Sequence, residues 1–137
     1  MFKTSRSRGR QRGAVVMESA LTILLLVMIT IGTLELGRAV WCYNTLPYAV
    51  RQATRYAIVH GSTSTSPATE TQLATTVARN AVGLDSSALT VTTTWLPNNQ
   101  PGSAVRIRAR YNFSLAAAFY IPATMSFFST SQMVIVR

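Results

Sequence analysis

The chain has 137 residues and a formal net charge of +9, and 48% of its residues are hydrophobic while only 12% are charged. This length fits about one domain and argues against a multidomain enzyme. The charged fraction is about half of the roughly 25% that soluble globular domains carry, and such an apolar chain is not intrinsically disordered. The single cysteine, Cys42, excludes an intrachain disulfide and a cysteine metal cluster.

The basic residues are concentrated at the N-terminus. Five of the thirteen lie within the first twelve residues: Lys3, Arg6, Arg8, Arg10 and Arg12. This segment shows no apolar periodicity and its like charges repel one another, so we predict that the first twelve residues are disordered and that residues 1–13 form a basic leader peptide. A short basic segment in front of an apolar run places the N-terminus in the cytoplasm and exports the chain that follows.

An apolar helix is predicted directly after the leader. The sequence is uncharged from Ser19 to Leu34, and inclusion of Ala14 to Met17 brings the run to about 20 residues, the length that spans a bilayer. We therefore predict a transmembrane helix over residues 14–34 and an exported domain over residues 35–137. Apolar residues continue at helical spacing, which predicts one helix of more than forty residues ended by Gly61; they are Ala39, Tyr43, Leu46, Val50, Ala53 and Ala57.

A short second helix is predicted after the loop that is rich in serine and threonine. Ser66 is a candidate N-cap, Pro67 fits the first helical position and Glu70 fits the first turn. Leu73, Val77 and Ala81 form one apolar face, with a stop predicted at Gly83.

The hydrophobic period then changes from 3.6 to 2, which predicts strands. Alternation over residues 89–95, a turn-forming PNNQPG segment and alternation over residues 105–113 indicate a hairpin, and after the AAAFYIPAT loop residues 125–136 suit a third strand. In the second strand the core-facing residues are predicted to be Val105, Ile107, Ala109, Tyr111 and Phe113, packed against the helix stripe, while Arg106, Arg108 and Arg110 face water. The predicted fold class is α+β: a long N-terminal helix, a short second helix and a three-stranded antiparallel sheet.

No group of residues supports an enzyme. Glu18 and Glu35 are seventeen residues apart on one helix, roughly 25 Å, so they cannot share acid–base chemistry. His60, the only histidine, is expected to be a solvated group at the helix end, without a metal or a catalytic triad. We predict no catalytic residues, no metal and no cofactor.

Several residues keep two interpretations. Cys42 suits a packing role, with an intermolecular role as the alternative. Trp41, Tyr43 and Tyr48 suit either an aromatic belt at the membrane interface or core packing. The stripe Arg106, Arg108 and Arg110 suits a solvated sheet face better than a site for an acidic partner or nucleic acid.

Glu18 stands near the start of the membrane helix, where a charge is costly unless it is paired or interfacial. One interpretation places Glu18 at the interface. In the other, the leader is removed after Gly13, and the α-amino group of Ala14, protonated at neutral pH, becomes a partner for the carboxylate.

A basic leader that ends in glycine, with glutamate five residues later and a long apolar helix, resembles the class III signal of type IV prepilins and pseudopilins. More specifically, the segment from Arg12 to Gly61 resembles the TadE-like family of pilus assembly proteins, whose helix carries an E-x-G-R step and an R-x-A-x-R-Y-A step. The first step is present here at Glu35, Gly37 and Arg38. The second is present at Arg51, Ala53, Arg55, Tyr56 and Ala57.

This resemblance implies a pilin-like fold and a minor pseudopilin of a tight-adherence (Tad/Flp) type IV pilus, without enzymatic activity. It implies cleavage between Gly13 and Ala14 by a prepilin peptidase, and a role of Glu18 in assembly or processing. The implied partners are other pilin and pseudopilin subunits, the Tad assembly platform and the bacterial inner membrane.

Two other classes remain as alternatives. A secreted or membrane-anchored envelope protein with an ordinary signal segment would be cleaved after the small-x-small site at residues 30–32, so that its mature chain begins at Thr33. A nucleic-acid-binding protein would need an aromatic–basic surface, and the basic arm instead adjoins a membrane helix. We therefore expect no nucleic-acid partner.

Overall fold

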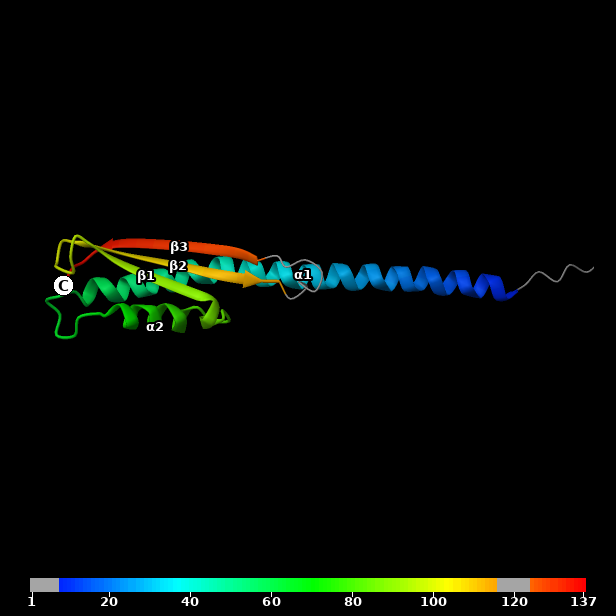
Figure 1. Cartoon of the computed structure of the whole chain (residues 1–137), viewed down its shortest axis with the longest axis horizontal. Helices are drawn as coiled ribbons and strands as arrows, with labels where there is room; N and C mark the ends of the chain where they lie inside the picture. The colour runs from blue at the N-terminus through cyan, green and yellow to red at the C-terminus, as the bar shows by residue number, and fades with distance from the viewer. Residues whose placement is uncertain (1–7, 116–123) are drawn as a thin grey trace, which may run out of the picture. The chain divides into compact units, whose positions relative to one another are not determined.

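The structure is a computed structural model that describes residues 8–115 and 124–137. Its elements in chain order (Figure 1) are α1 (Arg8–Val59), α2 (Glu70–Asn80), the short 3-10 helix η1 (Ser86–Ala88), β1 (Leu89–Leu96), β2 (Ala104–Ser114) and β3 (Thr124–Val134). The predicted α+β fold is confirmed. The chain divides into two compact units, of which the first ends at Leu36 and the second begins at Gly37, within α1.

The helix α1 has 52 residues, which confirms the prediction of one helix longer than forty residues. It begins at Arg8, before the Ala14 start that the charge pattern predicted. Arginine and glutamine are good helix formers, and each residue added to an existing helix gains a hydrogen bond without a new nucleation cost. The expected disorder of the leader is therefore wrong for residues 8–12, and residues 1–7 lie outside the described part of the chain.

The helix α2 begins three residues later than the Ser66 cap predicted. Its N-cap is Thr69, whose hydroxyl accepts a hydrogen bond from the backbone N–H of Gln72 at 3.3 Å, while the Gln72 side chain accepts from the Thr69 N–H at 3.0 Å. This reciprocal capping box satisfies two N–H groups at once. At the other end the helix stops at Asn80, and Gly83, at a φ of +81°, lies in the turn that follows.

The sheet is antiparallel with strand order β1-β2-β3. Along β2, buried residues alternate with exposed ones, and the buried set is the one that the period of 2 predicted, so the predicted register of this strand is confirmed. The third strand covers Thr124–Val134, which agrees with the predicted position within two residues. Most of the predicted AAAFYIPAT loop lies outside the described residues.

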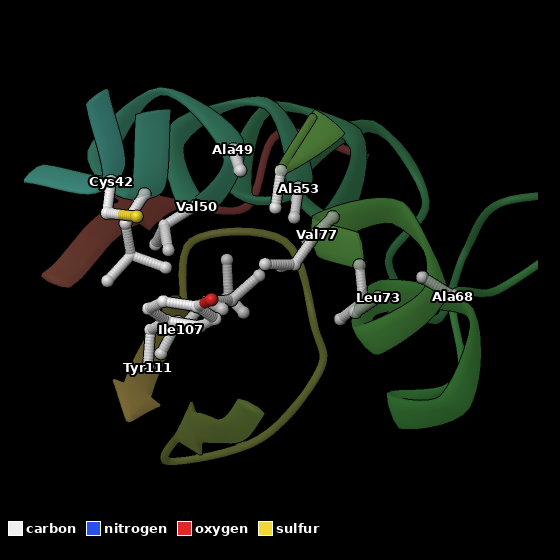
Figure 2. Packing of buried hydrophobic residues seen from close by; sticks show 14 of the residues in the cluster. Cys42, Ala49, Val50, Ala53, Ala68, Leu73, Val77, Ile107 and Tyr111 are labelled. Atoms are coloured by element: carbon white, nitrogen blue, oxygen red, sulfur yellow. The ribbon is translucent and has the colours of Figure 1, made fainter. Parts of the chain in front are cut away.

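One hydrophobic core holds the second unit together. Side chains from α1, α2 and the inner face of β2 converge in it, as Figure 2 shows for Val50, Val77 and Ile107. The helix α2 lies along β1 and contributes Leu73 and Val77. The core residues are Cys42, Leu46, Ala49, Val50, Ala53, Ala57, Ala68, Leu73, Val77, Ala81, Val105, Ile107, Ala109, Tyr111, Phe113 and Ile135.

Tyr43 does not belong to this core, contrary to the prediction. Its side chain is 66% exposed and lies edge-on to the Phe127 ring, at 6.4 Å between ring centroids. The buried face of α1 is centred instead on Leu46, Val50 and Ala53, and its N-terminal end is Cys42. Leu46, Val50, Ala53 and Ala57 of the predicted stripe are thus confirmed as core residues, and only Tyr43 is replaced, by Cys42.

The last three residues of the chain close the C-terminal end of α1. The N–H groups of Val136 and Arg137 both donate to the Ile58 carbonyl, at 2.9 and 3.2 Å, and the Gly61 N–H donates to the Arg137 carbonyl at 2.6 Å. The Ile135 side chain is fully buried beside them. The Ile58 carbonyl, which has no partner within the helix because it lies in the last turn, is thus satisfied by the end of the chain.

We expect Gly61→Ala to destabilise the second unit. A Cβ at this position would lie 2.5 Å from the Arg137 carbonyl oxygen and 2.6 Å from Cγ2 of Ile135, so backbone would have to move. Overpacking of this kind costs about 1–3 kcal/mol, measurable as a lower midpoint of thermal unfolding of the full chain in neutral detergent. Gly37→Ala is the matched control, because nothing lies within 4 Å of a Cβ there. Equal midpoints for Gly61→Ala and the wild type would contradict this close contact.

Candidate functional site

The first part of α1 has no cover from the described chain. Every residue from Gly13 to Leu34 is exposed, and α1 is long and apolar enough to cross a membrane. Exposed apolar side chains over such a length require a bilayer or other apolar chains around them. This helix is a single-pass membrane anchor.

The hydroxyl groups in this segment are compatible with lipid. Ser19 donates to the carbonyl of Val15 at 2.9 Å, and Thr22 to that of Glu18 at 2.9 Å. Thr30 and Thr33 donate in the same way, each to the carbonyl four residues earlier. Because each hydroxyl has a partner on its own helix, its transfer into a bilayer leaves no donor unsatisfied.

Glu18 is the only ionisable residue between positions 14 and 34. Its side chain is exposed, and its backbone carbonyl accepts the Thr22 hydroxyl. The carboxylate is therefore the one group of this segment whose burial in lipid would carry a substantial cost.

Gly13 and Ala14 both lie within α1 and are exposed. A Cβ on Gly13 would meet no atom within 4 Å, and its φ is not positive. The packing and the backbone conformation of this chain therefore do not explain why position 13 is a glycine.

The E-x-G-R step lies where the first unit ends and the second begins. Glu35 is half-buried, and Gly37 has open space around its Cβ position. The Arg38 guanidinium lies over the Phe113 ring, 5.1 Å from its centroid. This cation–π contact connects the step to the end of β2.

The R-x-A-x-R-Y-A step separates into buried and exposed positions. Ala53 and Ala57 are fully buried, where a small side chain lets α1 approach the rest of the core closely. Arg51 and Arg55 are exposed, and Arg51 Nε donates to the Pro47 carbonyl at 3.2 Å. The alanines thus serve the fold, while the two guanidinium groups remain accessible on the surface.

Tyr56 forms a contact that the sequence analysis missed. Its ring stacks on the His60 imidazole with 4.0 Å between centroids, and His60 Nδ1 lies 2.9 Å from the Tyr56 carbonyl oxygen. His60 is thus half-buried rather than solvated as predicted. The spacing of four residues at the end of α1, where His60 directly follows the last helical residue, is the signal that would have found this pair.

The three aromatic residues of α1 near the membrane segment are all exposed, which decides against core packing. They are Trp41, Tyr43 and Tyr48. Trp41 also donates from Nε1 to the Val82 carbonyl at 2.9 Å, which joins α1 to the segment after α2. An aromatic belt at the membrane interface stays a prediction for them.

Cys42 is buried, which confirms its packing role. Burial raises the pKa of its thiol, and the opposing charge of Arg38 is the smaller influence. The group is therefore a neutral thiol at pH 7. Within the described residues, no group of three or more histidine, cysteine, aspartate or glutamate side chains is placed to hold a metal ion.

Comparison with known proteins gives one family. Residues 13–55 match the family model described as TadE-like protein. Comparisons with curated proteins and with solved structures gave no significant match. The match covers Gly13, Glu18, the whole E-x-G-R step and Arg51 to Arg55 of the second step. The resemblance predicted from the sequence is thus confirmed, and the long helix of this chain carries a TadE-like segment over residues 13–55.

Proposed function

We propose that this protein is a minor pseudopilin, or an equivalent assembly component, of a tight-adherence (Tad/Flp) type IV pilus. The observation that carries the proposal is the segment Gly13–Leu34, which is exposed throughout, bears one charge and lies within the TadE-like match. Such a helix serves as a membrane anchor before assembly, and side-by-side packing with other subunits can cover it afterwards. The protein then acts through packing and not as an enzyme.

Gly13 and Ala14 are exposed, so the bond between them is accessible for the removal of a leader. The fold of this chain does not require a glycine at position 13, as it does not at Gly32 or Gly37, so the proposal assigns this glycine to recognition by another molecule. A prepilin peptidase that approaches the backbone closely at this bond is such a molecule. The processed chain begins with the protonated α-amino group of Ala14, four residues before Glu18.

The remaining assignments follow the same proposal. The N-terminus lies in the cytoplasm, the helix spans the inner membrane, and residues 35–137 form the exported domain. The partners are the prepilin peptidase, the other pilin and pseudopilin subunits and the Tad assembly platform. In the R-x-A-x-R-Y-A step, Arg51 and Arg55 are exposed and thus accessible to a neighbouring subunit.

We expect Gly13→Leu to keep its leader when it is produced with its cognate prepilin peptidase, because a bulky side chain blocks the approach to the backbone. Intact-mass measurement and N-terminal sequencing of the purified protein test this. The matched control is Gly32→Leu, another glycine of α1 with open space around it, which should be cleaved as the wild type is.

The same measurement separates the alternatives. A mature chain that starts at Ala14 in the wild type and stays uncut in Gly13→Leu supports the proposal. A start at Thr33 would indicate an ordinary secretory signal, although α1 continues through residues 31–33 without a break. An unchanged mature mass in Gly13→Leu would remove the main support for a pseudopilin.

A further inference from the structure

The outer face of the sheet carries a line of three cations. Arg106, Arg108 and Arg110 all project from β2 and are exposed. Side chains at alternate positions of a strand lie about 6.8 Å apart, so the line extends over about 14 Å. The residues paired with these arginines across the sheet are Thr94 and Gln132, Thr92 and Thr130, and Thr90 and Phe128.

These charges are not neutralised within the sheet. None of the three strands contains an aspartate or a glutamate. Arg106 Nε donates to the Gln132 side chain at 2.9 Å, and Arg110 Nε donates to Asn112 at 3.1 Å. Arg110 Nη2 also donates to the Ser126 hydroxyl at 3.2 Å. Neutral acceptors thus orient two of the guanidinium groups and leave their positive charge available.

An aromatic ring adjoins one end of this line. The Phe128 side chain is 63% exposed, and the Arg110 guanidinium lies 5.4 Å from its centroid. The exposed side chains of Phe128 and of Val134, which share this face, are not explained by the core, which lies on the other side of the sheet. We call Arg106, Arg108, Arg110 and Phe128 together the arginine face.

We propose that the arginine face binds single-stranded nucleic acid, with the phosphate backbone along β2 and a base stacked on Phe128. A line of cations fits a linear polyanion, whose charges also repeat along a chain. An exposed ring beside the cations favours a polyanion that carries planar bases, since base–aromatic stacking and backbone charge together drive single-strand binding. An open antiparallel sheet with helices on its other face is a surface that single-strand binders use.

This inference revises the expectation that the protein has no nucleic-acid partner. That expectation required an aromatic–basic surface, and the pairing of Arg110 with Phe128 across β2 and β3 supplies one. The inference does not depend on a role in a pilus, because it concerns only the outer face of the sheet in the second unit.

The test uses the full chain in nanodiscs of neutral phosphatidylcholine and a fluorescein-labelled twelve-residue oligothymidine. Fluorescence anisotropy gives the dissociation constant at several salt concentrations. We expect the triple variant Arg106→Gln, Arg108→Gln, Arg110→Gln to bind at least about tenfold more weakly. Its salt slope should be smaller by about 2, because each phosphate contact of a single strand contributes about 0.7. Phe128→Ala should bind about tenfold more weakly with an unchanged salt slope.

The matched control replaces three exposed arginines of the helices, Arg51, Arg55 and Arg79, by glutamine, with the same loss of charge. The basic N-terminal segment is present in every variant, so only differences between variants report on the arginine face. Equal weakening in the control and in the triple variant would overturn the proposal. So would tighter binding of polyglutamate or polyuronate than of oligothymidine, together with no effect of Phe128→Ala.

Discussion

Ile107→Asp is expected to abolish folding of the second unit, the largest stability effect that we anticipate in this chain. Ile107 is fully buried at the centre of β2, among side chains from both helices. A carboxylate there would lose the hydrophobic burial of the isoleucine and would be left in an apolar site without an opposite charge. Mutations of this kind cost about 4 kcal/mol or more, a large part of the total stability of a small domain. Loss of the near-UV circular dichroism of the full chain in neutral detergent would show it.

Arg108→Asp is the matched control, one residue further along β2 on the solvent-exposed face. The same acidic group introduced there should leave the near-UV spectrum and the unfolding midpoint close to those of the wild type, because surface substitutions usually change stability by no more than about 0.5 kcal/mol. Equal loss of folded protein in both variants would contradict the alternation of buried and exposed residues along this strand.

The position and orientation of β2 could be predicted because the alternation of apolar and charged residues lies within the strand itself. In β2, arginine at every second position leaves only one face that can be buried, so the alternation fixes both the strand and its orientation. The helix α1 carries a weaker signal, because its apolar face is wider than one line of residues. Leu46, Val50, Ala53 and Ala57 of the predicted stripe are buried, but Tyr43 near its N-terminal end is not. In the structure, Cys42 and Ala49 complete the buried face of the helix. Tyr43 instead lies against Phe127, a residue 84 positions away in the chain.

Other features depend on contacts that no local pattern contains. Ser66 followed by Pro67 is a favourable helix start on its own. The helix nevertheless begins after Thr69, because Thr69 and Gln72 together satisfy two backbone N–H groups. Gly61 was predicted as a helix stop, whereas its need for a small residue comes from Ile135 and Arg137 at the other end of the chain. A contact between residues this far apart in the chain cannot be predicted from the hydrophobic periodicity of the sequence.

The candidate sites also divide into features that a local sequence pattern indicates and features that depend on long-range contacts. The motifs of α1 could be recognised from the sequence through their resemblance to the TadE-like family, because glycine, glutamate and arginine stand at fixed intervals on one helix. The line of arginines on β2 was also visible, but not its aromatic neighbour. Phe128 reaches Arg110 only through the pairing of β2 with β3, which no local sequence pattern contains.

Glu18→Gln is expected to reduce strongly the incorporation of the processed protein into the proposed pilus. Glutamine keeps the shape of the side chain but removes the one charge of the membrane segment. A carboxylate in lipid is costly unless it is paired, and cleavage after Gly13 would create a partner, the Ala14 amine of a neighbouring subunit. Pairing between subunits sets their axial stagger, which pairing within one helix does not. Loss of an ion pair from an apolar environment should reduce incorporation by about tenfold or more.

Intact mass of the membrane-extracted protein and its co-purification with sheared pili, measured on the same cells, separate the two roles open to Glu18. We expect the Glu18→Gln protein to be cleaved and membrane-inserted but depleted from pili by about tenfold or more. The control is Ser19→Ala, the adjacent position, which loses only a hydrogen bond within its own helix and should be incorporated normally. Normal incorporation of Glu18→Gln would refute the pairing. Failure of cleavage would instead assign Glu18 to recognition by the peptidase, because an uncut chain never exposes the Ala14 amine with which the carboxylate would pair.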